Sequence, residues 1–179
     1  MSGGNPVPEA IVRRIVLDEA ERAMHRATNT VEGEWKRRLV PGVRGYRTGT
    51  YARSITNRVT RYGDRVVGEV GSALQVAKWL EYGTGIYGPE HRLIRPKKPG
   101  GVLRFPEPGN AAFTLAGRQR SGRAGAGARW VYARYVRGIR PRRYAHDAAL
   151  IARPKVIRIF RQAGERVSVR LIEQSGGPR

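Results

Sequence analysis

The chain has 179 residues, no cysteine and a formal net charge of +21 at pH 7. This composition excludes disulfides, thiolate catalysis and cysteine-ligated zinc, and no apolar stretch approaches the ~20 residues of a membrane span. The length suits one domain with a modest core, and the arginine-rich charge favours anionic partners such as nucleic acid, acidic protein surfaces or anionic lipid. A GC-rich genome would raise the arginine content as well.

The first predicted element is a long helix. Residues 1–8 form a loose, proline-containing arm, and helical spacing of apolar residues runs from Ile11 to Leu39. Pro8 and Glu9 are typical of a helix start, and Pro41-Gly42 of a helix end. The weak helix formers between Thr28 and Gly33 leave open whether this is one bent helix or two.

A short helix, a hairpin and a second helix follow. Thr48 has the character of an N-cap for a short helix through Ser54. Alternating residues over 54–61 and 66–70, joined by Tyr62-Gly63-Asp64, predict a β-hairpin. The next helix opens at Gly71-Ser72 and stops at Gly83.

The second half of the chain is predicted to be less regular. Residues 86–129 read as an extended basic loop region with one or two strands, followed by a strand over 130–137. Pro141 precedes a C-terminal helix that Pro154 should kink or divide, and 176–179 form a flexible tail.

These elements predict an α+β fold. A long N-terminal helix and a C-terminal helix would pack on a small antiparallel β-sheet, as a single domain over residues 9–175.

Catalysis is poorly supported by the sequence, so we expect no enzyme, no metal and no cofactor. His25, His91 and His146 lie in three separate segments without metal-ligand spacing. Glu81, at the end of an apolar helix, is better explained as held by an arginine or by backbone amides than as a general acid. Gly83-Thr84-Gly85 is too short for a phosphate-binding loop, and its glycines suit positive φ at a helix end.

The basic tract from Pro108 to His146 has two interpretations. It contains no acidic residue, and Trp130, Tyr132 and Tyr135 are interleaved with its arginines. Such a surface could bind a nucleic acid strand, although no zinc-finger, recognition-helix or RNP signature is present. It could equally dock on an acidic protein neighbour. Because many phosphate contacts would hold DNA tightly and oppose its passage, we expect the tract to face protein.

Three junctions in a fixed order resemble the HK97 gp10-like family of tailed-phage proteins. They are Thr48-Gly49 with Ser54-Ile55, the segment Ala77 to Gly85 that contains Leu80-Glu81-Tyr82-Gly83-Thr84-Gly85, and Pro141 with Tyr144. The resemblance covers about residues 9–165. Tyr51 stands where the family has an aliphatic residue, and residues 86–129 are longer and richer in arginine than the family core.

The resemblance implies a structural virion protein of the neck or tail-completion type, also called a head–tail connector protein. The implied subunit forms a ring, with a hexamer as the usual expectation, and joins the head connector to the tail. Its implied partners are the stopper or connector, the tail terminator and the tail tube, with a non-specific DNA contact left open. The implied location is the head–tail junction of a virion assembled in the host cytoplasm, in agreement with an N-terminus unlike a signal peptide. The alternative function is a basic nucleic-acid-binding module.

We therefore expect interface or structural roles, and no catalytic role, for a defined set of residues. Glu81 could pair with an arginine of the next subunit, and Trp35 joins the set as a core candidate. The set is Thr48, Gly49, Ser54, Trp79, Glu81, Tyr82, Gly83, Thr84, Gly85, Arg118, Arg120, Arg123, Arg142, Arg143 and Tyr144.

Overall fold

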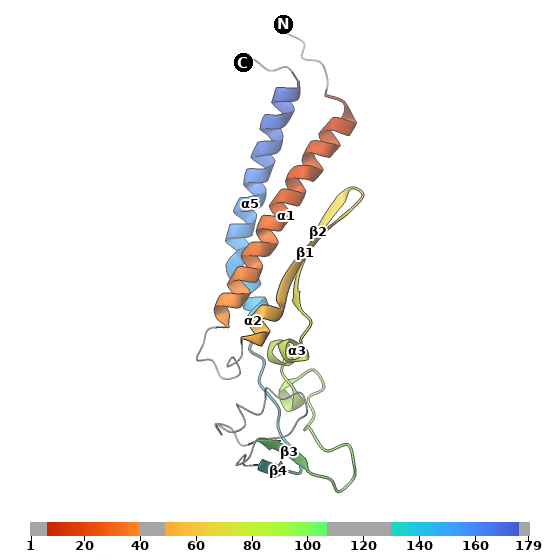
Figure 1. Ribbon diagram of the computed structural model, residues 1–179, viewed down its shortest axis with the longest axis vertical. Coiled ribbons are helices and arrows are strands. Elements are labelled where there is room, and N and C mark those ends of the chain that lie inside the picture. The colour runs from red at the N-terminus through yellow and green to blue at the C-terminus, as the bar shows by residue number, and fades with distance from the viewer. Residues whose placement is uncertain (1–6, 40–48, 107–129, 176–179) are drawn as a thin grey trace. The chain divides into compact units, whose positions relative to one another are not determined.

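The computed structural model describes residues 7–39, 49–106 and 130–175 (Figure 1). They belong to two compact units. Unit 1 comprises Met1–Glu81 and Arg143–Arg179, and unit 2 comprises Tyr82–Arg142. The single-domain boundaries 9–175 stay a prediction. Helices combined with small antiparallel sheets confirm the α+β class.

Helix α1 (Glu9–Arg38) is one uninterrupted helix of 30 residues. It begins directly after Pro8, as predicted, and three basic residues fill its last turn, where they complement the helix dipole. The segment from Thr28 to Gly33 does not divide it. The predicted stop at Pro41-Gly42 lies outside the described residues.

Helix α5 (Tyr144–Gln174) runs antiparallel to α1 (Figure 1). The prediction that Pro154 could divide this helix is wrong, because α5 continues for 31 residues through the proline. Pro154 is exposed, so its ring and the unpaired backbone group it creates lie on the side away from α1. Ala148, Ala152 and Ala163 are buried, and their small side chains give α5 a narrow contact face.

The hairpin of unit 1 follows a short helix. Helix α2 (Thr50–Ser54) leads into β1 (Ile55–Tyr62), which pairs with β2 (Arg65–Ser72) across the two-residue turn Gly63-Asp64. The predicted hairpin is thus confirmed. The predicted helix start at Gly71-Ser72 is wrong, because those residues complete the pairing with Ile55 and Thr56 and helix α3 (Gln75–Tyr82) starts afterwards.

The core of unit 1 lies where these elements meet. Its buried members are Trp35, Leu39, Tyr51, Ile55, Ala77 and Ala148. The Trp35 indole N–H donates to the Tyr51 hydroxyl at 3.2 Å, and the two rings meet edge to face with centroids 6.4 Å apart. The hydroxyl of Tyr51 thereby satisfies the buried donor of Trp35, which an aliphatic side chain could not do.

Unit 2 contains the 3₁₀ helix η1 (Gly85–Tyr87) and two short strands, β3 (Leu103–Pro106) and β4 (Trp130–Ala133). The strands pair antiparallel from Leu103↔Ala133 to Pro106↔Trp130. The predicted strand over 130–137 is too long. A strand extends only as far as its partner, and beyond Ala133 a single bridge, Ile94↔Val136, replaces the ladder.

The hairpin lies close to α1 at Gly68. A Cβ atom at this position would come within 2.6 Å of both Met24 Sδ and Thr28 Cγ2. Asn57 on β1 donates to Asn29 Oδ1 at 2.8 Å and also bonds to Glu32 of α1. Close approach and polar contacts together fix the hairpin on α1.

Substitution of Gly68 therefore tests this contact. We expect Gly68→Val to lower the free energy of unfolding by about 2–3 kcal/mol, because an added side chain overpacks the interface. Urea unfolding followed by circular dichroism measures the change. Gly71→Val on the same strand is the matched control, since a Cβ there meets nothing within 4 Å. Equal losses in both variants would contradict a tight contact at Gly68.

Candidate functional site

Glu81, in the last turn of α3, caps helix α5 from outside that helix. Its Oε2 accepts the backbone N–H of Ala145 at 2.8 Å, and its Oε1 accepts that of His146 at 3.0 Å. The first backbone N–H groups of a helix lack partners within the helix and carry partial positive charge. The N-cap of α5, Arg143, makes no side-chain capping bond. Glu81 thus supplies the cap through backbone amides, one of the two alternatives that the sequence left open.

This geometry removes the reason to expect an ion pair between Glu81 and an arginine of the next subunit. Both carboxylate oxygens already accept hydrogen bonds within the chain, so Glu81 needs no arginine from a neighbour. The same two bonds give Glu81 a structural role.

Gly83, Thr84 and Gly85 pair with the segment 137–139 inside unit 2. Thr84 N donates to Ile139 O, and Ile139 N donates to Thr84 Oγ1, both at 2.9 Å. Gly83 and Gly85 have φ values of 77° and 64°, and a Cβ at Gly85 would lie 2.1 Å from Arg137 O. Both positions require glycine for conformation and for close backbone approach.

Gly138 belongs to the same crossing and was missed in the sequence analysis. Its φ is 94°, and a Cβ there would lie 2.1 Å from Thr84 O. The only signal was a glycine among arginines shortly before Pro141. Nothing local pointed to a partner more than 50 residues away.

The Thr48-Gly49 and Ser54 junction lies at the base of the hairpin. The N-cap of α2 is Gly49, with φ 62° and no side-chain capping bond, so the prediction of Thr48 as that cap is wrong. Thr48 lies outside the described residues. The Ser54 hydroxyl donates to Tyr51 O at 2.6 Å and lies 2.7 Å from the Ser72 hydroxyl, which ties the two ends of the hairpin together.

The aromatic candidates separate into buried and exposed residues. Trp35 is buried and Tyr144 packs against the core of unit 1. Trp79 and Tyr82 are 45% and 60% exposed, so they are available to a partner and contribute little to the core. Val76, one turn before Trp79, is exposed as well.

The arginine candidates are only partly described. Arg142 and Arg143 are exposed at the junction before α5, and Arg143 adopts the left-handed conformation with φ 51°. Arg118, Arg120 and Arg123 lie outside the described residues. Three arginines of unit 2 stack on aromatic rings, and the closest pair is Arg104 over Trp130 at 3.9 Å to the ring centroid. The other two pairs are Arg95 with Tyr135 and Arg140 with Tyr87.

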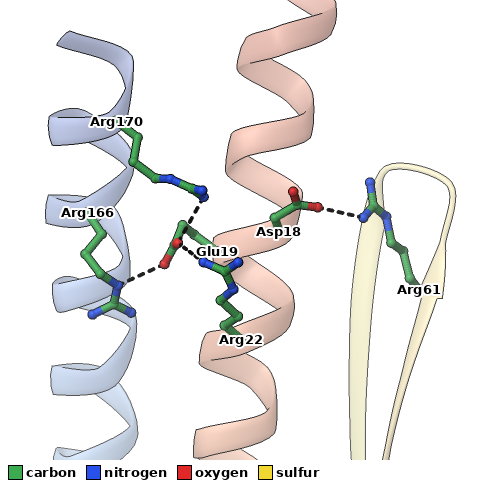
Figure 2. A network of polar contacts seen from close by, with 6 residues as sticks. All are labelled: Asp18, Glu19, Arg22, Arg61, Arg166 and Arg170. Carbon is green, nitrogen blue, oxygen red and sulfur yellow. Dashed lines mark hydrogen bonds and ion pairs between the residues drawn. The ribbon is translucent and has the colours of Figure 1, made fainter. Parts of the chain in front are cut away.

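A buried carboxylate between α1 and α5 was not predicted (Figure 2). Glu19 is 2% exposed and accepts hydrogen bonds from Arg22 and Arg166 at 2.8 Å and from Arg170 at 3.2 Å. The hydrogen bond from Arg166 lowers the pKa of Glu19 below its usual value, against the raising effect of burial. A buried charge is costly unless it is paired, so these contacts hold the two helices in register.

A second buried carboxylate repeats this arrangement near the other end of α1. Glu34 is 7% exposed and accepts a hydrogen bond from Lys155 of α5 at 2.8 Å, which lowers the pKa of Glu34. Arg37 adds an ion pair at 2.5 Å. The sequence signal was two glutamates on the face of α1 that also carries its buried alanines, but their partners lie more than 120 residues away.

The described residues show no site for a metal. None of their His, Asp and Glu side chains gather in groups of three that could hold an ion. His91 Nδ1 lies 3.2 Å from Ile86 O, and His146 lies beside Asp147. None of the helices in the described ranges has the length and apolar character of a membrane span.

Comparison with known proteins gives one match. Residues 9–83 match the family model described as "Bacteriophage HK97-gp10, putative tail-component", which confirms the predicted resemblance over that range. The match spans α1, α2, the hairpin and α3 and ends at Gly83. No curated protein and no solved structure matched the chain. The matched part of the chain is therefore similar to a structural component of phage tails.

Removal of the Glu81 cap should destabilise unit 1. We expect Glu81→Ala to lower the free energy of unfolding by about 1–2 kcal/mol, because two helix N–H groups lose their acceptor. Glu81→Gln should cost less, since one amide oxygen remains. Denaturant unfolding measures both. Glu90→Ala, which removes an exposed carboxylate paired with Arg92, is the control and should change little. A loss from Glu81→Ala no larger than the control would rule out the cap.

Glu19 should make stability depend on acid pH. Its folded-state pKa lies below the usual 4.5, so its stabilisation is present above pH ~4.5 and is lost as pH falls through the lower folded value. We expect Glu19→Gln to cost roughly 1–3 kcal/mol at pH 7 and to flatten the loss of stability below pH ~4.5. Denaturant unfolding between pH 7 and pH 3 tests both effects.

The matched control for Glu19 is its neighbour Asp18, which forms an exposed ion pair with Arg61 at 3.2 Å (Figure 2). Asp18→Asn should cost under about 1 kcal/mol, because exposed ion pairs contribute little. If both variants cost the same and leave the same pH profile, burial of Glu19 does not matter for stability.

Proposed function

We propose that this chain is a structural virion protein of the neck or tail of a tailed phage. The observation that carries this proposal is the family match over residues 9–83, which spans most elements of unit 1. The description of that family names a tail component. The locked pair of α1 and α5 suits a scaffold, because a scaffold needs fixed geometry more than a reactive pocket.

The finer proposal is a ring-forming subunit that joins the head connector to the tail, with six copies as the expected number. A ring needs two different contact surfaces on each subunit, since adjacent copies meet head to tail. Exposed apolar side chains on α3, namely Val76 and Trp79, offer one such surface. The proposed neighbours are the stopper or connector, the tail terminator and the tail tube.

Unit 2 is proposed to contact an acidic protein neighbour. Its sequence holds 13 Lys and Arg residues but two acids, Glu90 and Glu107. A guanidinium stacked on a ring, as Arg104 is on Trp130, keeps its edge N–H groups for a carboxylate. Exposed Tyr132, Tyr135 and Val102 accompany the arginines. Arginine together with aromatic side chains is typical of protein interfaces.

A nucleic-acid-binding module is the second candidate, because the same charge would attract phosphates. Binding of the full chain to a 20-bp duplex between 50 and 200 mM salt separates the two. Loss of binding by several orders of magnitude over that range is the behaviour of any polycation and supports the structural proposal. Sequence-selective or salt-resistant binding would favour the module.

Deletion of the gene in the phage that carries it tests the structural proposal. We expect DNA-filled heads and separate tails by electron microscopy, and loss of infectious particles by plaque count. Wild-type protein supplied in trans should restore both, and so should Gly71→Ala, a substitution at an exposed strand position without close neighbours. Mass spectrometry of purified virions should detect the chain. Normal particles without it would refute the proposal.

A further inference from the structure

The hairpin of unit 1 forms a sheet by itself, and no other described strand pairs with either of its outer edges. β1 and β2 pair over all eight residues without a bulge, and neither strand contains proline or lysine. Natural proteins usually protect an exposed edge with such residues, with bulges or with a covering segment, because unpaired backbone groups can bind another strand. Two unprotected edges therefore mark surfaces on which a further strand could add.

The turn of the hairpin identifies the backbone groups that point outward. Gly63 has a φ of 58°, which is typical of the first central residue of a type II′ turn, and the residues that flank such a turn, Tyr62 and Arg65, form a hydrogen-bonded pair. Hydrogen-bonded and non-hydrogen-bonded pairs alternate along an antiparallel ladder, so every second residue directs its N–H and C=O outward. Within the part of the chain that the structure describes, no hydrogen bond from outside the hairpin reaches these backbone groups. They belong to Asn57, Val59, Arg61, Val66, Gly68 and Val70.

The side chains of the same residues face α1, so the other residues of the hairpin form the face turned away from that helix. Asn57 is bonded to α1, and Arg61 points toward Asp18 of that helix (Figure 2). Successive side chains of a strand point to opposite faces, and Arg58 and Glu69 thus lie on the face away from α1, directly opposite each other. Both are exposed, so the middle of this face presents one charge of each sign.

We propose that β1 of one copy pairs with β2 of the next copy in the ring, so that the hairpins of neighbouring copies join into one continuous sheet. This inference rests on the proposed ring and names the contact between its subunits. Copies related by rotation about the ring axis have the same direction along it, and β1 and β2 run in opposite directions within each copy. The new ladder is therefore antiparallel throughout. A ring requires two different contact surfaces on each subunit, and the two edges of the hairpin are such a pair.

Charge favours the pairing of β1 with β2 over the pairing of β1 with a second β1. β1 carries Arg58 and Arg61 and no acid, whereas β2 carries Glu69. If the ladder continues at the same level into the next copy, Arg58 gains the Glu69 of that copy as a second opposite neighbour. A register shifted by two residues makes them diagonal neighbours, which long side chains still reach. Two β1 strands side by side would bring together arginines alone, and like charges destabilise strand pairing.

The first test exchanges charges between copies in the phage that lacks the gene, with the plaque count as the readout. Arg58→Glu gives both strands an acid at this level, and Glu69→Arg gives both strands an arginine, so neither variant should assemble alone. Because a ring repeats the contact in every copy, we expect each variant to lower the plaque count by about 100-fold or more. When both variants are expressed together, they can alternate around the ring with opposite charges at every contact, and the count should return to the wild-type level.

Recovery in the mixture cannot come from repair within one chain, because each chain keeps its own like charges. Asp64→Arg is the matched control, since it makes the same change of charge at an exposed position of the turn, away from both edges, and should leave the plaque count unchanged. Normal counts from both single variants, or no recovery when the two are expressed together, would overturn the proposal.

The second test reads the strand pairing by disulfide formation between copies, in a chain that has no cysteine of its own. Thr60 and Val67 lie opposite each other in the ladder, so oxidised particles assembled from a mixture of Thr60→Cys and Val67→Cys copies should contain covalent dimers. A cysteine at Arg65 or Glu69 in place of the one at Val67 detects a register shifted by two residues. Thr60→Cys copies alone should not couple, and their coupling with each other would indicate paired β1 strands and contradict the proposal.

Mass spectrometry of the same particles separates this proposal from the proposed function. If virions contain the chain but none of the cysteine mixtures couples, the pairing of hairpin edges is wrong and the structural proposal stands. A cross-link from Thr60→Cys to a different virion protein would assign the edge to that protein and would overturn the pairing as well. Absence of the chain from virions would refute the structural proposal and the ring contact with it.

Discussion

The buried carboxylate of Glu19 is the contact on which the arrangement of unit 1 depends. A carboxylate removed from water must be paired, and its partners Arg166 and Arg170 come from the far end of the chain. Glu34 and Lys155 repeat the pairing about four helical turns away. Two such points fix both the direction and the register of α5 on α1, which the small alanine contacts between them would specify only weakly.

These buried ion pairs between α1 and α5 compensate for a core that contains few large buried side chains. Among the described residues, Ile55 is the only large side chain that is fully buried, and the core cluster gathers where α1, α2 and the hairpin meet. Much apolar surface is left on α3 and α5. Such exposed apolar surface agrees with the proposed assembly, in which neighbouring copies would cover it.

Sequence reasoning predicted what depends on local signals. The start of α1 at Pro8-Glu9, the hairpin and the stop of α3 at Gly83 all follow from spacing or turn chemistry, and the structure agrees. Sequence reasoning failed where a residue or strand distant in the sequence determines the local structure. The length of β4 is set by β3, Pro154 is tolerated because it lies on the exposed side of α5, and Gly138 is needed because Thr84 approaches it.

The buried glutamates were missed for the same reason. Glu19 and Glu34 look like ordinary surface charges of a helix until α5 is placed beside them, and no local pattern names Arg166 or Lys155 as partners. The role of Glu81 was predicted as one of two alternatives, because a carboxylate at a helix end can find either cations or amides. The position of α5 beside Glu81 determines that its partners are the backbone amides of Ala145 and His146.

The cap formed by Glu81 also explains how the chain accommodates unit 2. The polypeptide leaves unit 1 at Glu81 and returns at Arg143, and the Glu81 carboxylate touches the amides of Ala145 and His146. The positions at which the chain leaves and re-enters unit 1 are therefore held together by hydrogen bonds within unit 1. Unit 2 is therefore an insertion between two chain positions that hydrogen bonds within unit 1 already hold together.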